Sequence, residues 1–148
     1  MNKIRATLGL LLAAVLAGAF AVAGSASPRS GDLHATKECS HYFGRAGDYC
    51  TITSSSLNAI DSGMRVVYAS AAGANGLDSD LVLDGPGNND ANGHVTLDFQ
   101  TLSGEVTFSG GTGRFRGFHA RVDVTYDAGS GLWHWDGTYS FTPPGHDR

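Results

Sequence analysis

The chain has 148 residues, with a formal net charge of −4 at pH 7, 21 glycines and two cysteines. This length suits one domain with a single core. An acidic chain with dispersed arginines binds phosphate backbones poorly, so we expect no nucleic-acid partner. After residue 26 no window has a sustained helical period, whereas valine, threonine and aromatic residues recur, so the sequence predicts an all-β fold.

Residues 1–26 have the organisation of a secretory signal peptide. Lys3 and Arg5 precede an almost wholly apolar run over residues 6–23, and small residues follow it directly. A permanent membrane anchor is the alternative, but the small residues favour cleavage. We expect a secreted bacterial protein that begins between Gly24 and Ser27 and has no membrane association after cleavage. The loss of two positive charges then changes the net charge from −4 to −6.

Two short features precede the predicted sheet. Residues 27–38 are polar and irregular in pattern, so we expect a flexible lead-in. Cys39 and Cys50 follow at close spacing, which predicts a disulfide in an oxidising compartment. The alternative is that the cysteines are reactive thiols or bind a metal together with His41. Two cysteines at this spacing favour a disulfide over that alternative.

Residues 39–143 are predicted to form one β domain, followed by a short tail over residues 144–148. Clusters of glycine, asparagine and aspartate, including Asn92-Gly93, separate segments of strand-like composition. The candidate strands are residues 49–53, 65–70, 80–84, 94–101, 105–109, 117–126 and 132–141. About seven antiparallel strands at short spacing indicate a barrel or a sandwich, and periodicity alone does not choose between them.

The glycine-rich stretch over residues 109–117 is predicted to reverse the chain between two strands. The segment that follows, residues 118–126, alternates strictly between apolar and polar residues, as a half-buried strand does. We expect positive φ at Gly111 or Gly113, because a tight reversal needs a residue without a Cβ atom.

Large aromatic residues are predicted to share one face of the sheet and to be buried there. This face forms either a filled core or the lining of a cavity for a small apolar or aromatic molecule, and packing is the commoner use of such residues. The candidate ligand-binding residues are Tyr68, Phe99, Phe108, Phe118, Tyr126, Trp135 and Tyr139.

Two motifs resemble those of a known superfamily. Residues 109–117 (SGGTGRFRG) resemble a glycine-rich segment of the allene oxide cyclase and dirigent barrels, and residues 135–141 (WDGTYSF) are similar to the closing strand of bacterial secreted members. The resemblance implies an eight-stranded antiparallel barrel with an apolar lumen, often trimeric, that positions reactive small molecules. Glu38 and Glu105 do not match the context of the cyclase glutamate, so no catalytic residue is assigned.

Other polar groupings favour solvent-exposed surface over chemistry. The Asn88, Asp90 and Asn92 pattern lacks the glutamate that a calcium loop needs. Asp78, Asp80 and Asp84 alternate on one strand and are predicted to face water. The polar faces that carry His119, Asp123, His134 and Asp136 have no recognisable ligand spacing. We therefore expect no metal and no cofactor.

Two functions from different classes follow from the sequence. The first is a carrier or structural domain without catalytic activity that binds a small apolar or aromatic molecule in its lumen. The second is a cofactor-free isomerase or cyclase, with Tyr68, Tyr126 or Tyr139 as hydrogen-bond donors. A partner-binding protein with a filled core is a third possibility.

Overall fold

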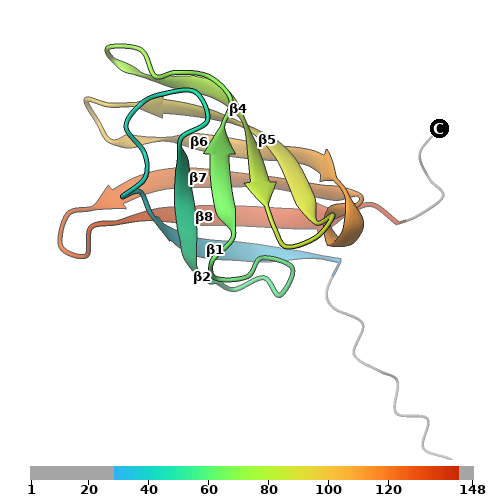
Figure 1. The fold of residues 1–148 in the computed structure, drawn as a ribbon. Coiled ribbons are helices and arrows are strands. Elements are labelled where there is room, and N and C mark those ends of the chain that lie inside the picture. The colour runs from blue at the N-terminus through green and yellow to red at the C-terminus, as the bar shows by residue number, and fades with distance from the viewer. Residues whose placement is uncertain (1–28, 144–148) are drawn as a thin grey trace, which may run out of the picture.

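The computed structural model describes residues 29–143, which form a closed barrel of antiparallel strands (Figure 1). The predicted signal peptide and the predicted tail over residues 144–148 lie outside the described residues. In chain order the strands are β1 (Ser30–Glu38), β2 (Tyr49–Ser55), β3 (Arg65–Tyr68), β4 (Gly76–Asp84), β5 (Asp90–Asp98), β6 (Ser103–Gly111), β7 (Phe118–Asp127) and β8 (Leu132–Phe141).

Each strand pairs with the next along the chain, and β8 pairs with β1 to close the ring. This confirms the predicted all-β fold as an eight-stranded antiparallel barrel and decides against the sandwich. Closure leaves no unpaired sheet edge among the described strands. Within residues 29–143, no helix has the length and apolar character needed to cross a bilayer.

The expectation of a flexible lead-in over residues 27–38 is wrong for β1. This strand pairs with β8 from Ser30↔Ser140 to Lys37↔Trp133 and with β2 from Ala35↔Ser55 to Glu38↔Thr51. Its inward positions carry Leu33, Ala35 and Lys37. Because two of these inward residues are a lysine and a small alanine, the sequence of β1 does not show the apolar alternation of a half-buried strand. Its strand conformation depends on pairing with β2 and β8 more than on its own composition.

The predicted turn at Asn92-Gly93 is also wrong, because both residues lie within β5. The hairpin between β4 and β5 turns instead over residues 85–89, which include Gly85-Pro86-Gly87. A Cβ atom on Gly93 would lie 2.9 Å from Cδ1 of Phe108 and 3.1 Å from Cδ1 of Leu81. Gly93 therefore serves close packing inside the barrel and not a reversal of the chain.

Aromatic rings fill the middle of the barrel and its glycine-rich end. Phe108 lies with its ring centroid 5.6 Å from that of Trp135 and 5.4 Å from that of Phe118, which in turn is 5.4 Å from Phe115. All four side chains are buried. Burying each of them contributes about 1.5 to 3 kcal/mol, so these rings are the main apolar support of the barrel.

The disulfide joins the end of β1 to the start of β2. Cys39 and Cys50 are bonded, with their Cα atoms 4.3 Å apart, and the described residues contain no free cysteine. This confirms the predicted pair. Restricting the unfolded chain in this way stabilises a domain by about 2 to 4 kcal/mol. We use "disulfide end" below for this end of the barrel.

The glycine-rich reversal contains a short 3₁₀ turn, η1 (Gly113–Phe115), which carries the buried Phe115. Gly113 has φ +58°, which confirms the expected positive φ at one of the two glycines. A Cβ atom there would lie 2.2 Å from Oδ1 of Asn89 and 2.5 Å from the carbonyl oxygen of Asn88. Position 113 therefore requires glycine for both its backbone angle and its space.

We predict that Gly113→Ala lowers the free energy of unfolding by about 1 to 3 kcal/mol, because it adds both backbone strain and a clash. Gly73→Ala is the matched control, since Gly73 has ordinary φ and its nearest neighbour would be 3.6 Å from the new Cβ atom. Urea unfolding of both variants measures the difference. Equal stability of the two would contradict the assignment.

Candidate ligand-binding site

A groove opens at the disulfide end, between the start of β8 and the loop that joins β5 to β6. Its volume is about 480 Å³, which is within the range of roughly 300 to 1,000 Å³ common for small-molecule sites. We call it the disulfide-end groove. Its lining consists of Glu38, Cys39, Ser40, Leu102, Tyr126, Gly131 and Trp133.

The exposed large hydrophobic residues of the described chain all lie at this end. Leu102 is 39% exposed and Tyr126 is 38% exposed, and both line the groove. Phe43, in the loop after the disulfide, is 69% exposed. Exposed apolar side chains that gather at one place commonly mark a binding surface. Tyr126 is exposed because the β7–β8 hairpin extends past the barrel (Figure 1).

Leu102 is held in an unusual backbone conformation. With φ +52°, it is the one residue other than glycine in the left-handed region among residues 29–143. Such a conformation costs of order 1 kcal/mol for a residue with a Cβ atom. The fold thus keeps a strained leucine at the rim of a groove, where a glycine would relieve the strain.

Next to the groove residues Glu38 and Trp133 the barrel buries a lysine. Lys37 is 5% exposed, and its Nζ atom lies 5.2 Å from the ring centroid of Tyr68, 5.4 Å from that of Trp135 and 5.9 Å from that of Trp133. A cation over aromatic faces gains electrostatic stabilisation, and more so when it is desolvated. Trp133 also lines the groove, so its indole contacts both the groove and the amine.

The amine has a phenol, and no carboxylate, as its polar partner. Lys37 Nζ donates a short hydrogen bond to Oη of Tyr68, which donates to Sγ of Cys50 at 3.6 Å. Burial lowers the pKa of Lys37 to about 7. Burial also raises the pKa of Tyr68, and Tyr42 adds to this. The amine is therefore partly neutral at physiological pH, and the phenol keeps its proton.

Two further polar atoms near this cluster are buried without a hydrogen-bond partner. They are Nε1 of Trp135 and Oη of Tyr42, whose ring packs edge-on against Tyr68 at 5.1 Å. Such groups cost of order 1 to 3 kcal/mol each. Together with the lysine they form a site with more donors than acceptors, which suits a ligand that brings an oxygen acceptor.

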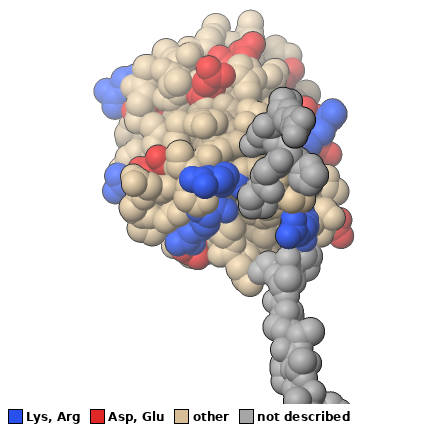
Figure 2. Space-filling model, turned by 90° about the vertical axis from the view of Figure 1, so that its right-hand side faces the viewer, with Lys and Arg blue, Asp and Glu red and all other residues tan. Residues whose placement is uncertain are grey.

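A second groove lies at the opposite mouth. Figure 2 looks towards this end of the barrel and shows basic side chains spread across it. The volume of this groove is about 600 Å³, and its lining consists of Arg29, Ser56, Leu57, Asn58, Ala59, Arg114, Tyr139 and Phe141. Arg114 is already paired with Asp61 at 2.8 Å and bonded to the carbonyl oxygen of Ala59. The charge of Arg114 is thus largely neutralised by its ion pair with Asp61.

The structure separates the predicted ligand-binding residues into two groups. Tyr68, Phe108, Phe118, Trp135 and Tyr139 are buried in the core, and Phe99 is partly buried against it. Tyr126 is exposed in the disulfide-end groove, while Tyr139 also borders the opposite groove. The aromatic residues therefore do gather inside the barrel, but they pack on one another there. Binding of a ligand by them stays a prediction.

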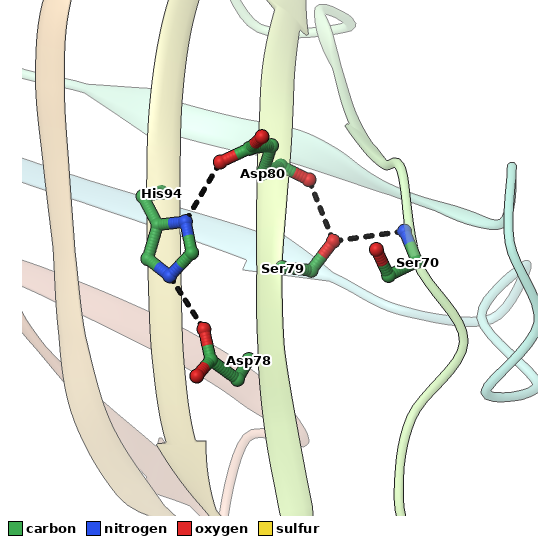
Figure 3. A network of polar contacts seen from close by, with 5 residues as sticks. All are labelled: Ser70, Asp78, Ser79, Asp80 and His94. Atoms are coloured by element: carbon green, nitrogen blue, oxygen red, sulfur yellow. Dashed lines mark hydrogen bonds and ion pairs between the residues drawn. The ribbon is translucent and has the colours of Figure 1, made fainter.

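A polar network on the outer wall links β4 and β5 (Figure 3). His94 lies between two carboxylates, with Nδ1 2.8 Å from Asp80 and Nε2 2.5 Å from Asp78. Ser79 points to the other side of β4 and bonds to the backbone of Ser70. The serine and the histidine do not meet, so the network is not a nucleophilic triad. Asp80 and Asp78 raise the pKa of His94.

The remaining polar groupings behave as surface. Arg121, Asp123 and Asp136 are exposed, and His134 is partly exposed. Asp136 is 2.7 Å from His34 of β1, and this is a pair that the sequence did not predict. Within residues 29–143, no group of three or more histidine, cysteine, aspartate or glutamate side chains has the geometry to hold a metal ion.

The sequence did not indicate Lys37, Trp133 and Leu102 as site residues. Lys37 could have been found from the alternation Leu33, Ala35, Lys37, which places a lysine at an inward position of a strand. The conformation of Leu102 has no such signal, because it results from the geometry of the β5–β6 loop.

Searches against protein-family models, curated proteins and solved structures gave no match to this chain. The resemblance to the allene oxide cyclase and dirigent barrels therefore stays a prediction, as does a trimeric assembly. The structure defines the class as a small, closed, eight-stranded up-and-down β-barrel with a disulfide.

We predict that Lys37 makes stability depend on pH. The unfolded chain holds this proton up to a pKa of about 10.5, whereas the folded chain releases it near 7. The folded state thus binds fewer protons between these values, so stability should rise from pH 7 to pH 10 by a few kcal/mol, and it should not change with this group below pH 7. The phenol of Tyr68 should oppose this rise only above pH 10, because its pKa is raised in the fold.

Urea unfolding of the wild type and of Lys37→Met across pH 6 to 10 measures this effect. The methionine variant should be more stable at pH 7 and should lose most of the rise, since it buries no amine. Arg121→Gln on the exposed wall is the control and should keep the rise. A rise of the same size in the Lys37→Met variant would contradict the assignment.

For His94 we predict a small effect of opposite sign. Its pKa is raised in the fold, so its contribution is complete below the unfolded value of 6.5 and is lost as pH rises through the folded value. The side chain is 46% exposed, so solvent screening keeps this contribution below about 1 kcal/mol. His94→Gln should therefore lower stability at pH 5 and leave it unchanged at pH 9. Titration of the His94 ring protons by NMR gives the pKa directly.

Proposed function

We propose that this protein is a secreted carrier that binds a small apolar or aromatic molecule at the disulfide end of the barrel. The observation that carries this proposal is that two exposed large hydrophobic residues, Leu102 and Tyr126, line one groove at that end. Mouths of β-barrels are common ligand sites. The disulfide supports an oxidising, extracellular location.

The groove suits a flat ring better than an alkyl chain alone. The rings of Tyr126 and Trp133 lie with their centroids 4.9 Å apart and tilted by 47°, so they present two aromatic surfaces to a ligand. Stacking on such surfaces adds about 0.5 to 1.5 kcal/mol beyond the burial of area. An aromatic ligand would therefore gain more here than an aliphatic one of equal size.

The charge at the rim favours a neutral ligand over an anion. Glu38 lines the groove, and its pKa is lowered by its hydrogen bonds with Ser40, so it is ionised at neutral pH. A carboxylate or phosphate placed beside it would be repelled. No arginine lines this groove to offset the repulsion.

Binding is favoured over the alternative of an isomerase or cyclase. Both glutamates lie on outward positions of their strands: Glu105 pairs with Arg121 at 2.6 Å on the outer wall, and Glu38 lies at the rim. Neither carboxylate is inside the barrel, where a substrate would be enclosed. A carrier needs only the apolar contacts and the directed donors beneath them.

We predict that 2-naphthalenemethanol, a neutral aromatic alcohol, binds with a Kd of micromolar order, or roughly 7 to 8 kcal/mol. Quenching of tryptophan fluorescence during titration measures this, because Trp133 borders the groove. Leu102→Gly should weaken binding about tenfold, since the ligand loses its apolar contact with the leucine side chain. It should not lower stability, since the left-handed backbone suits glycine.

The matched control is Asn58→Trp, which fills the opposite groove and should leave this Kd unchanged. If Asn58→Trp abolishes binding and Leu102→Gly does not, the ligand occupies the opposite mouth and the proposed location is wrong. If the alcohol does not bind to the wild type at millimolar concentration, the carrier proposal fails.

A further inference from the structure

The barrel buries an amine that is unique in the predicted mature chain. The sequence contains two lysines, Lys3 and Lys37, and Lys3 lies in the predicted signal peptide. Lys37 is thus the single lysine of the secreted form, and the fold places it in the barrel interior. A lysine kept only for solubility would lie on the surface, where lysines nearly always are.

The amine lies at the inner side of the proposed ligand groove. The residues that follow it in β1 and the loop, Glu38 and Cys39, line the groove, and so does its cross-strand partner Trp133. The indole of Trp133 lines the groove on one side, and its ring centroid is 5.9 Å from Nζ. A rotation of this one side chain, which is only partly buried, would bring a ligand in the groove to the amine.

The groups around the amine suit a carbonyl oxygen. Lys37 has one acceptor, Oη of Tyr68, for the protons of its amine, and Nε1 of Trp135 has none. A carboxylate ligand would also supply acceptors, but Glu38 at the rim disfavours an anion. A neutral molecule that ends in a carbonyl group satisfies both conditions.

We propose that Lys37 binds an aromatic or apolar aldehyde at the disulfide-end groove as a reversible imine. The lone pair of the neutral amine forms a bond to the carbonyl carbon, and a proton moves from nitrogen to oxygen to give the carbinolamine. The hydroxyl group then leaves with a second proton as water, and the C=N bond forms. The atoms balance without an oxidant or a reductant.

The surroundings of Lys37 supply what this step needs. A lysine must be neutral to attack, and desolvated lysines with lowered pKa are the amines that form imines in proteins. The pKa of about 7 gives a substantial neutral fraction at physiological pH. Oη of Tyr68 accepts a hydrogen bond from Nζ and keeps its own proton, so it can take part in the proton transfers.

This inference rests on the proposed function, so the test uses two probes that differ only at the reacting group. They are 2-naphthaldehyde and 2-naphthalenemethanol. Secreted wild-type protein is incubated with each at pH 7.5 and reduced with cyanoborohydride, which converts an imine to a stable secondary amine. Peptide mass mapping then locates the adduct. We expect the aldehyde to modify Lys37 ahead of the N-terminal amine by at least tenfold, and excess alcohol to slow this modification by competition.

Two variants sharpen the result. Lys37→Arg keeps the charge and cannot form an imine, so it should lose the adduct at position 37. Trp133→Ala removes the side chain that contacts the amine and also lines the groove. It should weaken binding of the alcohol, because a stacking surface is lost, but at saturating aldehyde it should accelerate adduct formation severalfold while circular dichroism shows the barrel intact. A variant that does not fold is set aside, because the wild-type peptide map decides the question by itself.

The outcomes separate the two proposals. If the alcohol binds and the aldehyde leaves Lys37 unmodified, or modifies the N-terminal amine equally fast, the imine inference is overturned and the carrier stands. If neither probe binds, the carrier proposal itself fails. If Lys37 is modified but excess alcohol does not slow it, the aldehyde reaches the amine outside the groove, and the inference is likewise overturned.

Discussion

The pairing of β1 with β8 is the constraint on which the rest of the structure depends. It closes the ring, and its register fixes which side of β1 faces inward. A shift by one residue would place His34 and Thr36 inside and Lys37 in water. Because the register from Ser30↔Ser140 to Lys37↔Trp133 is continuous, the lysine is carried into the interior beside the aromatic residues of β8.

The two ends of the barrel interior differ in polarity. The apolar end stabilises the fold, and the end with buried polar groups is the candidate binding site. Near the glycine-rich loop the ring of Phe118 packs against those of Phe108 and Phe115, so the interior there is apolar. Near the disulfide, Lys37 and Tyr68 place polar groups where an apolar core would be more stable. Buried polar groups that lower the stability of the fold commonly occur at functional sites.

The strained backbone of Leu102 is a further cost to stability at the disulfide end. A loop that joins two strands of a closed barrel has little freedom, since both strand ends are fixed by pairing on each side. The left-handed conformation of Leu102 directs an apolar side chain to the groove that Tyr126 and Trp133 also line. The disulfide holds the facing rim, because Cys39 lies in the same lining.

The sequence by itself determined the all-β class, the cysteine pair, the glycine-dependent reversal and the inward aromatic face, because each depends on local chemistry or on a period of two. It did not identify β1 as a strand, Gly93 as a packing residue or Lys37 as a buried amine. These depend on contacts between segments far apart in the chain. Gly93 meets Phe108 and Lys37 meets Tyr68 only when the barrel closes, so only the tertiary structure could decide them.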